Sequence, residues 1–207
     1  MRTHAANVLL QHSRWMTWNA LLALVPFGLA QLLFSRPRAR TATWWAGLVA
    51  FVLFLPNAPY VLTDVIHLFE DIRRVHSDRT VLFILVPVYA GLFTVGFGAY
   101  VLCIRQLAGW LRREGASHLR VGAVIVAIHG LSAVGIDLGR FQRFNSWDAF
   151  VRPVTLLTGF RELVDHPLRL VVTFAIVSCL YAATRVVTLG VQVWWSEQNA
   201  NWRHGLT

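Results

Sequence analysis

The chain has 207 residues, of which 56% are hydrophobic and only 14% are charged. Soluble domains carry about 25% charged and about 45–50% apolar residues, so this composition excludes an ordinary soluble domain and indicates a membrane protein. The formal charge is +9, and all 19 basic residues are arginines, placed mainly in short loops between apolar segments. This distribution argues against a nucleic-acid partner and favours arginines that orient the chain in a bilayer.

The chain begins with a stretch, 1–15, whose apolar core is too short for a convincing signal peptide and has no small-residue cleavage site after it. We therefore expect the first apolar segment to act as an uncleaved signal. The two cysteines, Cys103 and Cys179, both lie inside apolar segments and have no metal-binding spacing. We predict that both are buried packing residues rather than disulfide or zinc ligands.

Five apolar segments are long enough, or nearly so, to cross a membrane. They predict an all-α, polytopic helical bundle that forms a single domain over residues 1–207. The predicted spans are 18–34, 44–62, 80–104, 119–138 and 168–190. About thirty residues separate the last two spans, and an apolar stripe at helical spacing over 153–164 predicts a short helix on the membrane surface.

The second span is interrupted by Pro56 and Pro59. At about 1.5 Å per residue, its uninterrupted part covers about 18 Å of a core about 30 Å thick. Two alternatives follow: a kinked helix continues to Leu62, or the helix ends early and the chain surfaces irregularly. In the third span, Gly91, Gly96 and Gly98 provide small-residue surface for close helix packing.

The loop at 35–40, SRPRAR, is the densest short arginine loop and follows the first span directly. Because positive charge near span ends stays in the cytoplasm, we expect this loop and the C-terminus inside and the N-terminus outside.

Chemistry-bearing side chains gather in a first motif, LPNAPYVLTDVIHLFED, residues 55–71. Thr63 is predicted to cap a helix that starts at Asp64. From there Asp64, His67 and Asp71 fall at i, i+3 and i+7, on one stripe of an amphipathic interfacial helix. Asn57, between the two prolines, is expected to satisfy backbone groups freed by the helix break, with substrate contact as the alternative.

A second motif, GIDLGRFQRFNSWD, covers residues 135–148. Counting spans places it on the same side of the membrane as the first motif. Its candidate site residues are Asp137, Arg140, Arg143, Asn145 and Asp148. A carboxylate at the end of a span needs a partner, which makes Asp137 a stronger candidate than the others.

Three kinds of site fit these residues. Asp64, His67 and Asp137 could form an acid–base centre, since a carboxylate can orient and charge an imidazole. Asp64 and His67 with Asp71 or Glu70 give a weak metal signature, and the sequence does not identify a cofactor. In the third kind of site, Arg140 and Arg143 hold an anion as forked donors. Asn57, Asn145 and Asp148 are the further substrate-binding candidates of this site.

Structural alternatives apply to each of these residues. The charged stripe of the first motif is also what a solvated helix face looks like, and its acids could pair with Arg140 and Arg143 simply to tie two loops together. His129, in the middle of the fourth span, is either a buried neutral side chain or part of a function.

Residues 54–68 and 135–148, with the apolar run at 18–30, resemble the bacterial membrane-protein family known as domain of unknown function 1361. The resemblance covers about residues 18–195. It implies a polytopic protein of the bacterial inner membrane in which the two motifs are the hallmark, and it implies no particular activity.

The sequence leaves three function classes open, and both enzymes and non-enzymes are among them. The first is a membrane enzyme or lipid-handling protein that acts on a lipid head group or another anionic substrate. The second is a membrane scaffold or assembly subunit in which the motifs are a structural lock. The third is a small oligomeric transporter, whose broken helix would be the second span at the interruption by Pro56 and Pro59. The expected partners are membrane lipid and a protein partner or second copy, with no nucleic acid.

Overall fold

The computed structural model describes residues 2–37, 39–75 and 77–204, so Arg38 of the first arginine loop lies outside the described residues. Within these ranges all regular structure is helical. The elements are α1 (Arg2–Phe34), α2 (Ala42–Phe54), α3 (Asn57–Tyr60), η1 (Val61–Asp64), α4 (Val65–Arg74), α5 (Asp78–Thr80), η2 (Val81–Leu85), α6 (Val86–Arg113), α7 (His118–Phe141), α8 (Asp148–Val151), α9 (Pro153–Asp165) and α10 (Pro167–His204).

Five helical stretches among the described residues are long and apolar enough to cross a membrane. They are Arg14–Phe34, Ala42–Arg74, Asp78–Arg113, His118–Phe141 and Pro167–Gln192. This confirms the predicted all-α class with five candidate spans. The short helix expected at 153–164 is also present, as α9.

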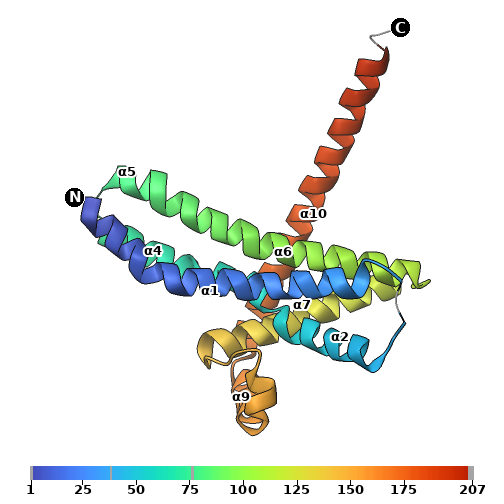
Figure 1. Ribbon diagram of the computed structural model, residues 1–207, viewed down its shortest axis with the longest axis horizontal. Helices are drawn as coiled ribbons and strands as arrows, with labels where there is room; N and C mark the ends of the chain where they lie inside the picture. Colours follow the sequence, from blue (N-terminus) through green and yellow to red (C-terminus); the bar gives the residue numbers. More distant parts are fainter. Residues whose placement is uncertain (1, 38, 76, 205–207) are drawn as a thin grey trace.

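The helices α1 and α6 lie side by side along the molecule, with α2 and α4 next to them, and α10 extends away from this bundle (Figure 1). α10 packs mainly on α7, and only a small part of its apolar surface is buried. Its outward side chains include Val171, Val186 and Leu189, each at least half exposed. A helix this apolar and this uncovered is suited to lipid rather than water as its solvent.

The part of the second span at residues 55–64, which contains Pro56 and Pro59 and is here called the proline segment, stays helical. Residues 42–74 run as α2, a short turn at Leu55 and Pro56, and then α3, η1 and α4. Pro59 lies within α3, and neither proline can donate a backbone hydrogen bond. Of the two alternatives, the structure therefore shows the kinked continuation, and it extends past Leu62 to Arg74. The predicted Thr63 cap is wrong, because the preceding turn is helical and the Thr63 hydroxyl donates to the Tyr60 carbonyl at 2.8 Å.

Two glycines let the proline segment sit deep between α6 and α7. A Cβ on Gly96 of α6 would lie 2.1 Å from Val61 Cγ2, and a Cβ on Gly135 of α7 would lie 2.5 Å from Pro56 Cγ. Any side chain at either position would collide with the segment. The predicted packing role is confirmed for Gly96, whereas Gly91 and Gly98 have no described neighbour within 4 Å of a built Cβ.

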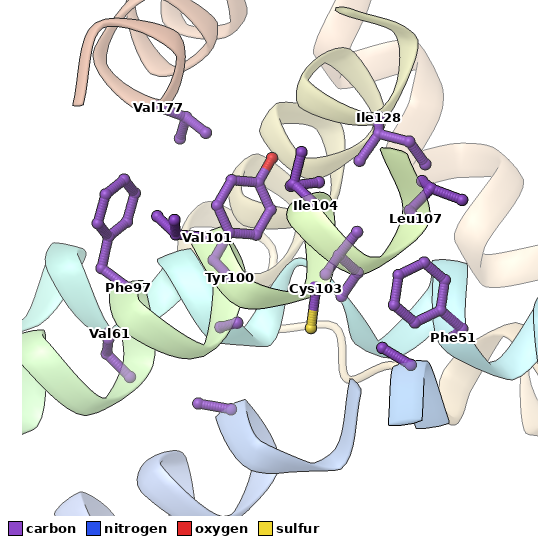
Figure 2. Close-up of a cluster of buried hydrophobic side chains, with 14 of the residues drawn as sticks. Phe51, Val61, Phe97, Tyr100, Val101, Cys103, Ile104, Leu107, Ile128 and Val177 are labelled. Atoms are coloured by element: carbon purple, nitrogen blue, oxygen red, sulfur yellow. The ribbon is translucent and has the colours of Figure 1, made fainter. Parts of the chain in front are cut away.

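The core is centred on α6. Figure 2 shows Tyr100, Ile104 and Leu107 of α6 beside Phe51 of α2 and Ile128 of α7. Cys103 is fully buried in this cluster, as predicted. The prediction for Cys179 is wrong, because it is exposed on α10.

The two carboxylates of the charged stripe at α4 are buried, whereas Glu70, Arg73 and Arg74 of the same helix are exposed. Asp64 and Asp71 are 2% and 0% exposed, whereas Ile66 and Phe69 are 41% and 57% exposed. The solvated-face alternative for the charged stripe is therefore wrong, since both carboxylates turn toward the protein. Buried acids beside exposed apolar side chains are what the lipid-facing part of a helix requires.

Candidate functional site

The two motifs meet at a pocket of about 370 Å³, here called the motif pocket. Side chains from α1, α2, the proline segment, α7, the loop after α7, α8 and α9 enclose it. Its apolar lining includes Leu22, Val52, Leu53, Leu131, Val134, Leu138, Leu156 and Phe160. Its polar lining consists of Asn19, Asn57, Tyr60, Arg143, Asn145 and Ser146.

Direct contacts join the motifs. The Asn57 side-chain amide donates to the Phe54 carbonyl at 2.9 Å and to the Ser146 hydroxyl at 2.7 Å. Tyr60 lies against Gly139, where a Cβ would be 3.2 Å from the ring. The predicted proximity of the two motifs is thus observed. Asn57 does satisfy a backbone carbonyl at the helix break, and it also lines the pocket.

Two buried carboxylates outside the motif pocket, Asp64 and Asp148, accept hydrogen bonds from residues that line it. The Asn19 amide donates to Asp64 Oδ2 at 3.2 Å, and the Asn145 backbone N–H donates to Asp148 Oδ2 at 2.7 Å. Neither Asp64 nor Asp148 lines the pocket itself. Both carboxylates are buried. Asp64 thereby holds the side chain of Asn19, and Asp148 holds the backbone of Asn145, and both asparagines line the cavity.

Arg143 is the cation of the motif pocket. It follows the C-terminal end of α7 with φ +59°, a left-handed conformation that usually falls to glycine or asparagine. Its side chain is exposed, and no ion pair joins it to a described residue. A strained backbone at a residue with an uncompensated charge is typical of a functional position.

Arg140 of the second motif and His67 and Asp71 of the first lie outside the motif pocket. Arg140 acts electrostatically on Asp64 but does not line the cavity. His67 Nδ1 lies 3.3 Å from Glu70 Oε2, and its ring centroid lies 5.0 Å from that of Trp15. Asp71 accepts a hydrogen bond from the Tyr89 hydroxyl at 2.9 Å. Among the described residues, no group of three potential ligands assembles a metal site from this stripe.

Asp137 lies in a different cluster, at the junction of α7, α9 and α10. It is fully buried, and its Oδ2 lies 3.6 Å from Arg169 Nε. Arg169 also approaches Glu162 at 3.6 Å and covers the ring of Phe141 at 4.4 Å. The expectation that Asp137 needs a partner is met by Arg169 of α10, and this pairing separates Asp137 from Asp64 and His67.

His129 is buried at the contact of α6, α7 and α10. Its Nδ1 lies 2.6 Å from the Tyr100 hydroxyl, which also donates to Ser132 at 3.3 Å. The Tyr181 ring of α10 packs on the imidazole, with centroids 5.1 Å apart. These contacts favour the structural alternative for His129.

Sequence reasoning missed three polar lining residues: Asn19, Tyr60 and Ser146. Asn19 was available as a signal, because an amide inside an apolar segment needs a hydrogen-bond partner. Tyr60 and Ser146 lie within the motifs and carried no separate signal.

The fold and the pocket together define a polytopic helical membrane protein with a part-polar, part-apolar cavity between two helix-end motifs. The chain matches the family described as protein of unknown function DUF1361 over residues 18–182, which include both motifs, and it belongs to this family. The match ends short of the predicted limit near residue 195. The comparison with curated proteins found no match, and neither did the comparison with solved structures.

Proposed function

We propose that this protein binds an amphiphile with an anionic head group in the motif pocket. The observation that carries the proposal is Arg143, a cation with a strained backbone and no described counter-ion at the polar part of a largely apolar cavity. A guanidinium donates in forked pairs to phosphate or carboxylate groups. The volume of about 370 Å³ falls within the range of about 300–1,000 Å³ common for small-ligand sites.

The amide side chains favour a head group that also donates hydrogen bonds. Asn57 uses its amide nitrogen for Phe54 and Ser146, so its carbonyl oxygen remains as an acceptor. Asn19 likewise uses its nitrogen for Asp64. A head group with hydroxyl or amine donors beside its negative charge would satisfy both amides and Arg143.

The pocket favours binding over acid–base chemistry. Among its lining residues only Arg143 and Tyr60 have titratable side chains. The carboxylates predicted as catalytic instead hold Asn19, in the case of Asp64, or pair with Arg169, in the case of Asp137. The residues that carry this function are therefore Arg143, Asn57 and Asn19 as ligand contacts, with Asp64 and Asp148 as positioning residues.

The test is to identify what copurifies with the protein. Protein purified in mild detergent is extracted with organic solvent, and the extract is quantified by mass spectrometry. We expect one anionic amphiphile in near-equimolar amount with the wild type and strong loss with Arg143→Gln. Arg161→Gln removes an exposed arginine of α9 that does not line the pocket, and it should retain the amphiphile. Equal retention by both variants would contradict the proposal.

A structural lock is the second candidate function, because the proline segment packs so closely on Gly96 and Gly135. If the motifs only lock the loops together, Asn57→Ala and Arg143→Gln should both reduce the folded yield. If the pocket is a binding site, Arg143→Gln should keep the wild-type yield and lose the amphiphile.

The proposed setting is the inner membrane of a bacterium, with the arginine-rich end of the bundle in the cytoplasm. This end carries Arg36 and Arg40 after α1 and Arg112 and Arg113 at the end of α6. Short arginine-rich loops of this kind favour the cytoplasmic side. The motif pocket, near the C-terminal end of α7 and the middle of the second span, would then receive head groups from the opposite leaflet.

A further inference from the structure

A second pocket lies at the arginine-rich end of the bundle and shares no lining residue with the motif pocket. It has a volume of about 380 Å³ and lies between the end of α1 and one face of α6. The lining residues of α6 recur at helical spacing, so they form a single face. We call it the arginine pocket, and the lining residues used here are Phe34, Leu102, Arg105, Gln106, Gly109 and Arg113.

The charge of the arginine pocket is positive and largely uncompensated. Arg105 is exposed and makes no ion pair with a described residue. Arg113 donates to the Phe34 carbonyl, which occupies one of its five N–H groups and shields the C-terminal carbonyl of α1. Glu114 is the nearby acid in the sequence, and Arg40 already binds it at 2.6 Å. The local charge therefore suits an anion.

The other side of the arginine pocket is apolar and open. Leu102 is 43% exposed and lies one turn from Arg105, toward the middle of the membrane. Gly109 leaves space, because a Cβ there would meet only the Arg113 guanidinium, at 3.7 Å, among described atoms within 4 Å. Arg105 and Arg113 thus lie next to the apolar helix face at Leu102. This arrangement matches the boundary between the phosphates and the acyl chains of a bilayer.

We infer that the arginine pocket binds the phosphate of an anionic phospholipid, with Arg105 and Arg113 as its donors and the exposed Leu102 against the first part of the acyl chain. Gln106 lines the same cavity and supplies an amide next to the head group. This site goes beyond the proposed function: it involves different residues, lies in the other leaflet, and does not depend on what occupies the motif pocket.

The test uses the full-length protein in detergent micelles, with native mass spectrometry as the readout. Delipidated protein is mixed with phosphatidylglycerol or phosphatidylcholine at equal concentration. We expect preferential binding of phosphatidylglycerol, weakened roughly fivefold by Arg105→Gln, since one arginine near an anionic lipid surface contributes about this factor. Arg105→Lys should retain most of the binding.

Two further variants separate the pocket from general surface charge. Arg120→Gln removes an exposed arginine at the same end of the molecule that does not line the pocket, and it should bind phosphatidylglycerol like the wild type. Gly109→Leu fills the cavity without changing charge and should weaken binding, while an unchanged thermal unfolding midpoint shows that the variant is folded. Because phosphatidylglycerol could also enter the motif pocket, Arg105→Gln is compared in the wild-type and Arg143→Gln backgrounds. The loss caused by Arg105→Gln should be the same in both, which keeps the two sites distinguishable.

Three results would overturn the inference. One is equal binding of the two lipids. Another is equal loss in Arg105→Gln and Arg120→Gln. The third is saturable binding of inorganic phosphate alone, measured by calorimetry and abolished by Arg105→Gln, without a preference between the two lipids; this would assign the pocket to free phosphate.

Discussion

Arg143 links backbone strain to the proposed ligand. A non-glycine residue in the left-handed region costs on the order of 1 kcal/mol, and φ is +59° here. A residue that costs stability at the rim of a cavity is therefore a candidate for a role of its side chain. The amides around it differ, because each is held by a hydrogen bond to a neighbour and would keep its place without a ligand.

This gives a prediction in which stability and binding move in opposite directions. Arg143→Gly relieves the left-handed strain, so we expect the free energy of unfolding to rise by about 1 kcal/mol. The same change removes the guanidinium, so the copurifying amphiphile should be lost. Thermal unfolding in detergent measures the first effect, and mass spectrometry of the extract measures the second. A lower unfolding midpoint for Arg143→Gly than for Arg143→Gln would show that the backbone is not strained.

Individual residues also show where sequence reasoning fails. Thr63 reads as a helix cap only if the chain before it is not helical, and the structure shows that it is. The pairing of Asn19 with Asp64 joins residues 45 positions apart, and spacing along one helix carries no information about such a partner. Arg143 was predicted as an anion ligand from its residue type, but its backbone conformation could not be predicted from the sequence.

Among the helices, α4 shows that periodicity predicts a face but not its direction. The stripe of Asp64 and Asp71 was correctly placed on one side of the helix. In water such a stripe turns outward, whereas in a bilayer the apolar side turns outward and the acids must find protein partners. The composition indicated a bilayer, but a short helix at a span end could have lain in either environment.

The fit of the proline segment against α7 can be tested with matched glycines. Gly135→Ala places a Cβ 2.5 Å from Pro56, and we expect it to cost about 1–3 kcal/mol of stability because the ring cannot move aside. Gly130 lies on the same helix with no described neighbour within 4 Å of a built Cβ, so Gly130→Ala should be neutral or slightly stabilising. Both are read from unfolding in detergent. Equal effects would mean that the segment does not wedge against α7.

The attachment of α10 depends on a buried ion pair. Arg169→Gln leaves the fully buried Asp137 carboxylate without its cation, and we expect a loss of about 3 kcal/mol in the free energy of unfolding. Glu162→Gln removes the other partner of Arg169, but Glu162 is about half exposed, so it should cost less than about 1 kcal/mol. Unfolding curves of the two variants decide between them. A larger effect for Glu162→Gln would assign the junction to that pair.

For the molecule as a whole, the hydropathy of the sequence located all five candidate spans, because lipid solvation is a property of local composition. The boundaries were less predictable. The second span runs to Arg74 and the third to Arg113, since charged residues at the helix ends are tolerated once they reach the bilayer surface or find partners. The pocket between the motifs depends on helix packing, and only the expectation that they share one side of the membrane came from the sequence.

The orientation of the molecule gives the last prediction. The loop between α1 and α2 and the junction of α9 and α10 lie at opposite ends of the bundle, because three spans separate them. If the arginine-rich end is cytoplasmic, an impermeant maleimide should label His166→Cys in intact cells and Ala39→Cys only after permeabilisation. Both positions are exposed, and both variants are made in a background with Cys103 and Cys179 replaced by serine or alanine. The reverse pattern would place the arginine pocket in the outer leaflet and the motif pocket in the inner leaflet. Each pocket would then meet the lipids of the leaflet opposite to the one proposed here. Labelling at both positions in intact cells would mean that the five candidate spans do not all cross the membrane.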